Sequence, residues 1–97
     1  MPSSITRVET PSGKKYMTQL CKHWGHKLNV TLEEERGRIE FDPARACDLR
    51  SDPEGLSLRV ITGTDEELER TQQTVINHLK RFAFREEFGD VTWTREG

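Results

Sequence analysis

One short stretch of the chain contains most of the side chains that could do chemistry. Cys21, His23 and His26 bring a thiol and two imidazoles within six residues, and both kinds of group bind transition metals. On a helix, Cys21 and His23 would lie about 200° apart, so they could not hold one ion together. A third ligand would have to come from elsewhere, and His78 and Glu86 are the candidates. A metal site at His23, His26 and His78 is therefore one hypothesis.

Catalysis needs more than this stretch provides. A nucleophile requires a base within hydrogen-bond reach, and that base requires a third group to orient it. The sequence offers Cys21 or Cys47 with a histidine, or His23 with Glu86 as an acid–base pair. Neither combination has a local signature, and the chain contains no CxxC pair and no HExxH motif. These observations favour a binding protein without a cofactor over an enzyme.

Length and charge restrict the class of protein. The 97 residues are 32% hydrophobic and 33% charged, so we expect a single soluble domain over residues 1–97 with a thin core. A net charge of −2 argues against a nucleic-acid-binding module, because such modules usually show an excess of basic residues. The chain shows no signal-peptide pattern and no apolar run of about 18 residues, so we expect a cytoplasmic protein without a membrane span. Cys21 and Cys47 should then be reduced.

The spacing of apolar residues predicts the elements that position these side chains. Helical spacing predicts one helix from Thr10-Pro11 to a left-handed Gly25 and another of about 20 residues after a capping box at Thr64 and Glu67. Alternation predicts strands at residues 28–33, 38–41, 47–50 and 56–61. Residues 4–8 are a further strand candidate with poor alternation, and residues 91–93 are expected to form a last extended piece. Short connections favour antiparallel pairing. The order β-α-β-β-β-β-α therefore predicts an α+β, two-layer sandwich: an antiparallel sheet with two helices on one face.

The second helix should be longer than the strands are. Twenty helical residues span about 30 Å, whereas a strand of five or six residues spans about 17–20 Å. One end should then overhang the sheet, and at the C-terminal end it would leave Phe84 about 140° from the apolar stripe. The tail around Trp93, the end of the first helix or another protein could cover this ring. A homodimer that buries Phe84 and Phe88 across a two-fold axis is the structural alternative.

We expect a ligand site where the ends of the two helices meet. Aromatic rings there would supply apolar contact, and guanidinium groups suit anionic carboxylate or catecholate groups. The alternative is that Trp24 packs in the core and that His23 and His78 are boundary histidines bonded to nearby backbone or carboxylate groups. The expected site residues are His23, Trp24, His26, Arg81, Phe82, Phe84, Arg85 and Glu86.

Two segments of the chain resemble the hallmark segments of the bacterial domain-of-unknown-function 2218 family. They are Leu20-Cys21-Lys22-His23-Trp24-Gly25-His26-Lys27 and Phe82-Ala83-Phe84-Arg85-Glu86-Glu87. Gly37-Arg38-Ile39, the turn from Asp52 to Gly55-Leu56 and the closing Val91-Thr92-Trp93 also fit, so the resemblance covers nearly the whole chain. The element order is also similar to the C-terminal domain of phosphohexomutases and to TATA-binding-protein-like folds, but a fold does not transfer function.

The family resemblance implies a biological context rather than a particular reaction. Some members are joined to siderophore-interacting flavin reductases, which implies an accessory role in iron–siderophore handling. A reductase of that kind or a small anionic ligand would be the partner. This chain is too short to include a flavin or nicotinamide domain of its own. The resemblance supplies no catalytic residues.

Overall fold

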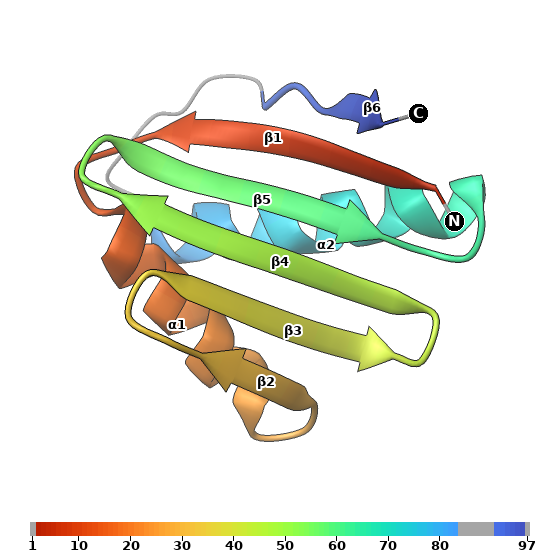
Figure 1. Ribbon diagram of the computed structural model, residues 1–97, viewed down its shortest axis with the longest axis horizontal. Helices are drawn as coiled ribbons and strands as arrows, with labels where there is room; N and C mark the ends of the chain where they lie inside the picture. The colour runs from red at the N-terminus through yellow and green to blue at the C-terminus, as the bar shows by residue number, and fades with distance from the viewer. Residues whose placement is uncertain (1, 84–90, 97) are drawn as a thin grey trace.

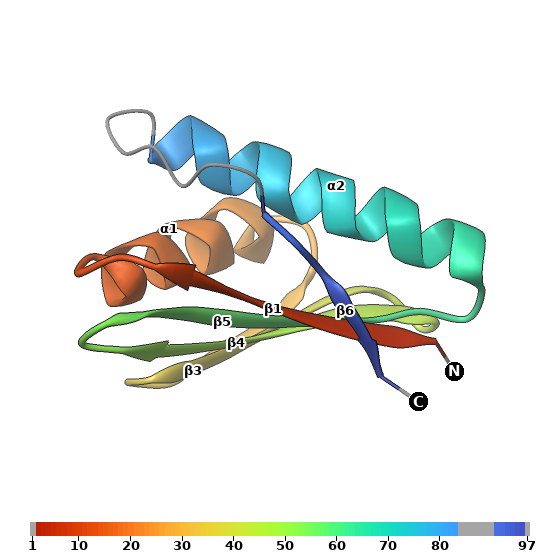
Figure 2. The same cartoon turned by 90° about the horizontal axis from the view of Figure 1, so that it is seen from above.

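Six antiparallel strands of the described residues form one sheet, and both helices pack on the same face of it (Figure 1, Figure 2). The computed structural model describes residues 2–83 and 91–96. Across the sheet the strand order is β2-β3-β4-β5-β1-β6. Along the chain the elements are β1 (Ser3–Glu9), α1 (Gly13–Gly25), β2 (Asn29–Leu32), β3 (Arg36–Asp42), β4 (Arg45–Asp52), β5 (Gly55–Ile61), α2 (Asp65–Phe82) and β6 (Thr94–Glu96).

The predicted α+β class and the two helices on one face are confirmed, with a difference in strand length. The strands β3, β4 and β5 have seven or eight residues, about 23–26 Å at 3.3 Å per residue. The 18 residues of α2 span about 27 Å. The predicted difference in length, on which the overhang of the second helix depended, is therefore wrong. The strands are longer because pairing with neighbours on both sides extends them into residues whose local pattern is irregular.

The ends of α1 differ in detail from the prediction. The helix begins at Gly13, because the Thr10 hydroxyl accepts a hydrogen bond from the Ser12 backbone N–H at 3.1 Å and forms a turn before the helix. It ends at Gly25 as predicted, but not in a left-handed conformation. The next residue, His26, has right-handed helical angles of φ −74° and ψ −23°. The chain therefore leaves the helix through a tight turn that continues toward β2.

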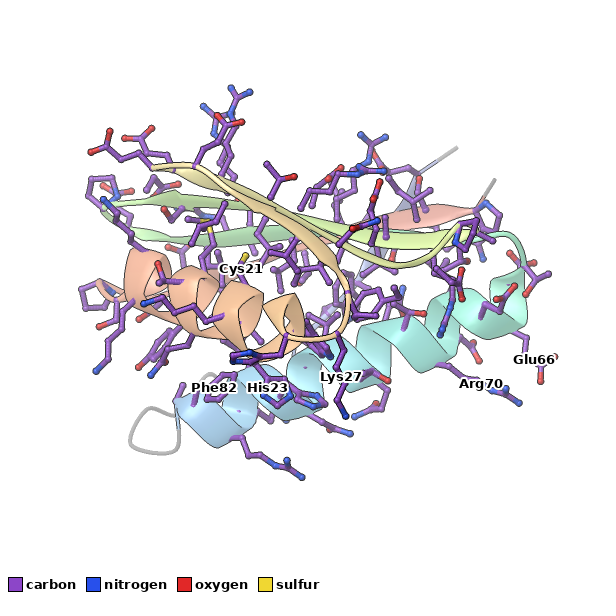
Figure 3. All side chains as sticks on the ribbon, turned by 90° about the horizontal axis from the view of Figure 1, so that it is seen from below. Cys21, His23, Lys27, Glu66, Arg70 and Phe82 are labelled. Carbon is purple, nitrogen blue, oxygen red and sulfur yellow. The ribbon has the colours of Figure 1, made fainter. Side chains whose placement is uncertain are left out.

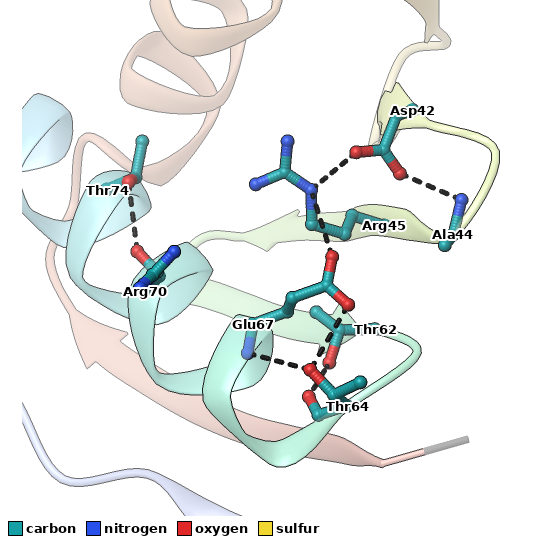
Figure 4. Close-up of polar contacts among 8 residues, drawn as sticks. All are labelled: Asp42, Ala44, Arg45, Thr62, Thr64, Glu67, Arg70 and Thr74. Carbon is teal, nitrogen blue, oxygen red and sulfur yellow. Dashed lines mark hydrogen bonds and ion pairs between the residues drawn. The ribbon is translucent and has the colours of Figure 1, made fainter.

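The start of α2 follows the predicted capping box. The Thr64 hydroxyl accepts a hydrogen bond from the Glu67 backbone N–H at 3.1 Å and contacts the Glu67 carboxylate at 3.1 Å (Figure 4). The other oxygen of Glu67 lies 3.9 Å from Nε of Arg45, which also donates to Asp42 at 2.7 Å. Arg45 therefore links the turn between β3 and β4 to the first turn of α2.

The core lies between the helices and the inner face of the sheet. Its fully buried side chains come from both helices and from the inner strands of the sheet, and they include Met17, Leu20, Ile39, Leu56, Leu58, Val60, Leu68, Val75 and Leu79. Cys21 and Cys47 are buried among them as free cysteines. In the described part of the chain, neither helix is of the length and apolarity needed to cross a membrane.

The last strand lies further along the chain than predicted. The extended piece expected at residues 91–93 precedes β6, whose three residues pair with Ser3, Ser4 and Ile5 of β1. Polar contacts hold it, because Glu96 accepts hydrogen bonds from Ser3 at 2.9 Å and from Arg59 at 2.8 Å. Trp93 packs against the core cluster. A three-residue strand without apolar alternation is not visible in the sequence pattern.

Candidate functional site

The last turn of α1 packs on the last two turns of α2 through four rings. The His23 ring centroid lies 5.0 Å from that of His78 and 5.8 Å from that of Phe82. The Trp24 ring lies 4.7 Å from His78 and 5.1 Å from Phe41 of β3. The structure thus brings together segments more than 50 positions apart, and we call His23, Trp24, His78 and Phe82 the helix-end cluster.

The two faces of α1 have different surroundings. Figure 3 shows His23 beside Phe82, whereas Cys21 lies between α1 and the sheet. His23 is exposed, and Trp24, His78 and Phe82 are half-buried. The cluster is therefore a partly open surface rather than part of the closed core. The interpretation of Trp24 as a packing residue holds for its contact with Phe41, and the same ring also borders the open side.

The hydrogen bond of His78 defines its tautomer. Its Nδ1 lies 2.8 Å from the carbonyl oxygen of Thr74, one turn earlier on α2. A carbonyl only accepts, so Nδ1 has the proton and Nε2 of the neutral ring keeps its lone pair. His78 is thus a boundary histidine bonded to backbone, as the alternative interpretation expected. Its Nε2 remains able to accept a hydrogen bond.

His26 and Arg81 lie beside the cluster on different elements. His26 and Lys27 line a hollow of about 690 Å³ between the end of α1 and the turn joining β3 and β4, which Phe41 and Arg45 also line. Arg81 is exposed in the last turn of α2. Phe84, Arg85, Glu86 and Phe88 lie outside the described residues. Of the eight expected site residues, five are therefore described, and three of these belong to the helix-end cluster.

The electrostatics of the cluster are basic. The pKa of His23 is lowered from 6.5, first because partial burial against the other rings disfavours the charged form. Neighbouring basic groups lower the His23 pKa further, in the order His78, Arg81, His26 and Lys27. Basic residues also occupy the last turns of both helices. These cations face the partly negative C-terminal ends of two helix dipoles, which offsets part of their repulsion.

We expect a measurable titration shift at His23. The NMR titration midpoint of its ring should lie below 6.5, and Arg81→Gln should raise it because one positive charge is removed. The unfolded state then binds more protons than the folded state, so His23 should contribute stability above pH 6.5 that is lost as pH falls toward the folded pKa. Arg70→Gln, near the other end of α2, is the matched control. Equal midpoints in the wild type and Arg81→Gln would contradict this assignment.

The structure gives little support to a chemical role for the two cysteines or to the hypothesis of a metal site. Burial raises the pKa of both the Cys21 and the Cys47 thiols, so neither supplies a thiolate at neutral pH. Among residues 2–83 and 91–96, no group of three or more His, Cys, Asp and Glu side chains is arranged to hold a metal ion. His23 and His78 are in ring contact, whereas His26 faces the neighbouring hollow. The acid–base pair of His23 with Glu86 involves a residue outside the described part.

The chain is similar to known bacterial proteins over nearly its whole length. The model of the bacterial family described as "uncharacterized protein conserved in bacteria (DUF2218)" matches residues 5–94, which include both helices and all strands except the start of β1 and the end of β6. The chain belongs to the DUF2218 family. The NMR structure of PA4090 from Pseudomonas aeruginosa is similar to it, with a TM-score of 0.82 and 35% sequence identity over 97% of this chain and 96% of that chain. No curated protein matches the chain.

The two segments that resemble the DUF2218 hallmarks are therefore neighbours in space. Residues 20–27 supply His23 and Trp24, and the described start of the second segment supplies Phe82. The likeness to phosphohexomutase and TATA-binding-protein folds stays a prediction.

Sequence reasoning missed one concentration of charged side chains in this DUF2218 chain. It lies on the face of the sheet opposite the helices, where arginines from four strands line one groove. Alternation placed Arg38, Arg50 and Arg59 only at solvent-facing positions, and Arg36, which begins β3, was expected in a turn. Their gathering depends on strand order and register, which single-strand patterns do not contain.

Proposed function

We propose that this DUF2218 chain is a binding or accessory module, not an enzyme, that holds an anionic aromatic ligand at the helix-end cluster. The proposal places it in iron–siderophore handling, as the family resemblance implies. The observation that supports it best is the combination of rings in edge-on and tilted contact with surrounding basic groups. Catecholate and aryl-carboxylate chelators combine an aromatic ring with negative oxygens, so they match both features.

The rings supply the apolar part of such a site. His23 is exposed, and its ring touches those of His78 and Phe82 at 5.0 and 5.8 Å between centroids. Aromatic pairs favour offset or edge-on arrangements, and a ligand ring would extend the cluster in the same way. Nε2 of His78 can accept a hydrogen bond from a hydroxyl group, because its Nδ1 is already bonded to the Thr74 carbonyl.

The charges supply the polar part. The groups that lower the His23 pKa include Arg81, His26 and Lys27, all of them basic. A guanidinium group donates two parallel hydrogen bonds to a carboxylate or catecholate, which gives Arg81 the main role in recognition. An anion bound there would also favour the charged form of His23, so binding should tighten as pH falls.

A binding role rather than catalysis follows from the chemistry of the nucleophiles. The two thiols are buried and protonated, with a raised pKa. The hydroxyl group of Thr74 donates to the Arg70 carbonyl at 2.9 Å, so it is engaged in backbone bonding. Nothing in the helix-end cluster forms the chain of nucleophile, base and orienting group that nucleophilic catalysis requires.

Titration calorimetry with 2,3-dihydroxybenzoate and with its ferric complex tests the proposal. We expect saturable binding of at least one probe and NMR shifts confined to residues 22–27 and 78–83. Arg81→Gln should weaken binding about tenfold, because a hydrogen bond to a charged group is worth about 1.5–3 kcal/mol and 1.4 kcal/mol corresponds to tenfold. It should leave the unfolding free energy nearly unchanged, because Arg81 is exposed.

The matched control is Arg70→Gln, which removes an arginine near the opposite end of the same helix. Arg70 is paired with Glu66 at 2.9 Å, and Figure 3 shows both far from His23. This variant should bind the probes as the wild type does. Absence of saturable binding, or equal weakening by Arg70→Gln and Arg81→Gln, would reject the proposal.

The metal-binding protein and the homodimer are alternatives without a specific observation in their favour. The first would need a third ligand beside the His23–His78 pair, and the second depends on Phe84 and Phe88, which lie outside the described residues. Metal analysis of the purified protein and light scattering at low concentration distinguish them from the proposal. Stoichiometric metal lost in His23→Ala would support the first, and a stable dimer the second.

A further inference from the structure

The outer face of the sheet forms a groove of about 1230 Å³. Both helices lie on the other side of the sheet (Figure 2), so the groove is separate from the helix-end cluster. The outward-pointing side chains of β1, β3, β4 and β5 form its floor, and Val91, Thr92 and Thr94 line one side. Ile5, 43% exposed, is an apolar element of the floor. A groove of this size exceeds what one small ligand usually requires.

Arginine is the main charged residue in this groove. Among the described residues, five arginines line it, whereas the carboxylates that line it are Glu9, Glu33 and Asp48. Three of the arginines have carboxylate partners at short distances. Arg7 donates to both oxygens of Asp52 at 2.8 and 2.9 Å, Arg38 donates to Asp48 at 2.7 Å, and Arg59 donates to Glu96 at 2.8 Å.

The remaining two arginines, Arg36 and Arg50, differ from these three. Among the residues that the structure describes, neither guanidinium group forms an ion pair or donates a hydrogen bond. Glu33 borders the same end of the groove, so one carboxylate stands against two guanidinium groups. Asp48 and Asp52 flank Arg50 on the same face of β4, but they are already paired with Arg38 and Arg7. Within the described residues, the two guanidinium groups therefore exceed the carboxylates left to balance them.

The strand register places these two arginines side by side. Arg36 of β3 lies directly opposite Arg50 of β4, and Arg50 lies opposite Ser57 of β5. Ser57 in turn lies opposite Arg7 of β1, so one straight row crosses four strands. Like charges directly opposite each other in an antiparallel pair destabilise the sheet. The neighbouring row avoids this cost, because Asp48 lies between Arg38 and Arg59.

We propose that Arg36 and Arg50 bind an oxyanion, the phosphate or carboxylate group of a small molecule that lies along the groove. Two guanidinium groups on neighbouring strands present fork-shaped donors to one anion, and bound negative charge removes their mutual repulsion. The Ser57 hydroxyl, which accepts from Arg7 at 3.1 Å, borders the same position and can donate its own proton to the anion. The site differs from the helix-end cluster in residues and in face of the sheet, and it stands whether or not the cluster binds a ligand.

Thermal unfolding with added sodium phosphate, and in parallel with sodium citrate, tests this site. Sodium chloride at equal ionic strength is the reference, because salt alone screens the arginine pair. Phosphate and citrate also stabilise proteins generally, so the double variant Arg36→Gln/Arg50→Gln measures that background. We expect the wild type to gain a few degrees of Tm beyond the double variant in phosphate, in citrate or in both.

The single variants and a control complete the experiment. Arg36→Gln and Arg50→Gln should each weaken binding of the anion about tenfold, and each should begin from a higher Tm in chloride because the like-charge pair is gone. Arg70→Gln should behave as the wild type. The proposal is overturned if wild type and double variant gain equally in both anions, or if the single variants bind as the wild type does. The phosphate and citrate series identify which oxyanion the pair prefers.

Discussion

Replacing Gly13 by alanine should destabilise the protein by about 3 kcal/mol, at the upper end of the cost of overpacking a tight contact. Gly13 is buried in the first turn of α1, where the helix meets the turn between β4 and β5. A methyl group there would overlap the carbonyl oxygen of Gly55 and lie 2.9 Å from its carbonyl carbon. Both atoms belong to the backbone of a paired strand, so no side-chain rotation can relieve the overlap. Urea unfolding followed by far-UV circular dichroism measures the loss.

Gly25→Ala is the matched control at the other end of the same helix. A methyl group at Gly25 would meet no atom within 4 Å, and the backbone there is not left-handed. Alanine loses less backbone entropy on folding than glycine does, so this variant should gain up to about 0.5–1 kcal/mol. If Gly13→Ala unfolds at the same urea concentration as the wild type, the close approach of α1 to β5 is wrong.

Replacing Trp24 by alanine should cost about 2 kcal/mol. A fully buried tryptophan costs about 3–5 kcal/mol on truncation, and Trp24 is half-buried, so we expect roughly half of that value. The indole joins three elements, since its ring lies 5.1 Å from Phe41 of β3 and 4.7 Å from His78 of α2. Truncation should therefore loosen the contact of α1 with α2 as well as lower the urea midpoint.

Trp24→Phe separates the ring contact from the indole itself. Phenylalanine keeps an aromatic ring at the position, so it should lose less than half of the free energy that alanine loses. His78 reports the loosening independently, because its ring proton shifts should move in Trp24→Ala and much less in Trp24→Phe. An unfolding free energy of Trp24→Ala equal to that of the wild type would show that Trp24 does not support the junction of the helices.

Patterns between residues close in the sequence predicted the helix cap and the buried faces of the strands well. Thr64 and Glu67 form the capping contact that their spacing predicted. Leu56, Leu58 and Val60 face the core, and Arg59 faces outward, as alternation along β5 predicted. One error arises where burial depends on the place of a strand in the sheet. Leu32, expected to face the core, is 40% exposed at the end of β2, which is an edge strand.

The helix-end cluster was predicted in part. Helical spacing placed His23 and Trp24 in the last turn of the first helix and Phe82 near the end of the second, so their meeting needed only that both helices cover one face. The contact of His78 with both His23 and Trp24 could not be predicted, because it depends on the crossing of α1 and α2. The position of His26 in the neighbouring hollow depends on the turn that follows Gly25.

The types of the elements, their order and the faces of their residues were determined by the sequence itself, because a period of two or of 3.6 residues acts between near neighbours. Strand order and register were decided only by the tertiary structure, because pairing joins residues far apart in the chain. Those two properties place Arg36 against Arg50 and let β6 pair with β1. The packing of α2 over α1 likewise brings His78 to His23. Both candidate binding surfaces are assembled from such distant residues, and each single segment shows only its own part of them.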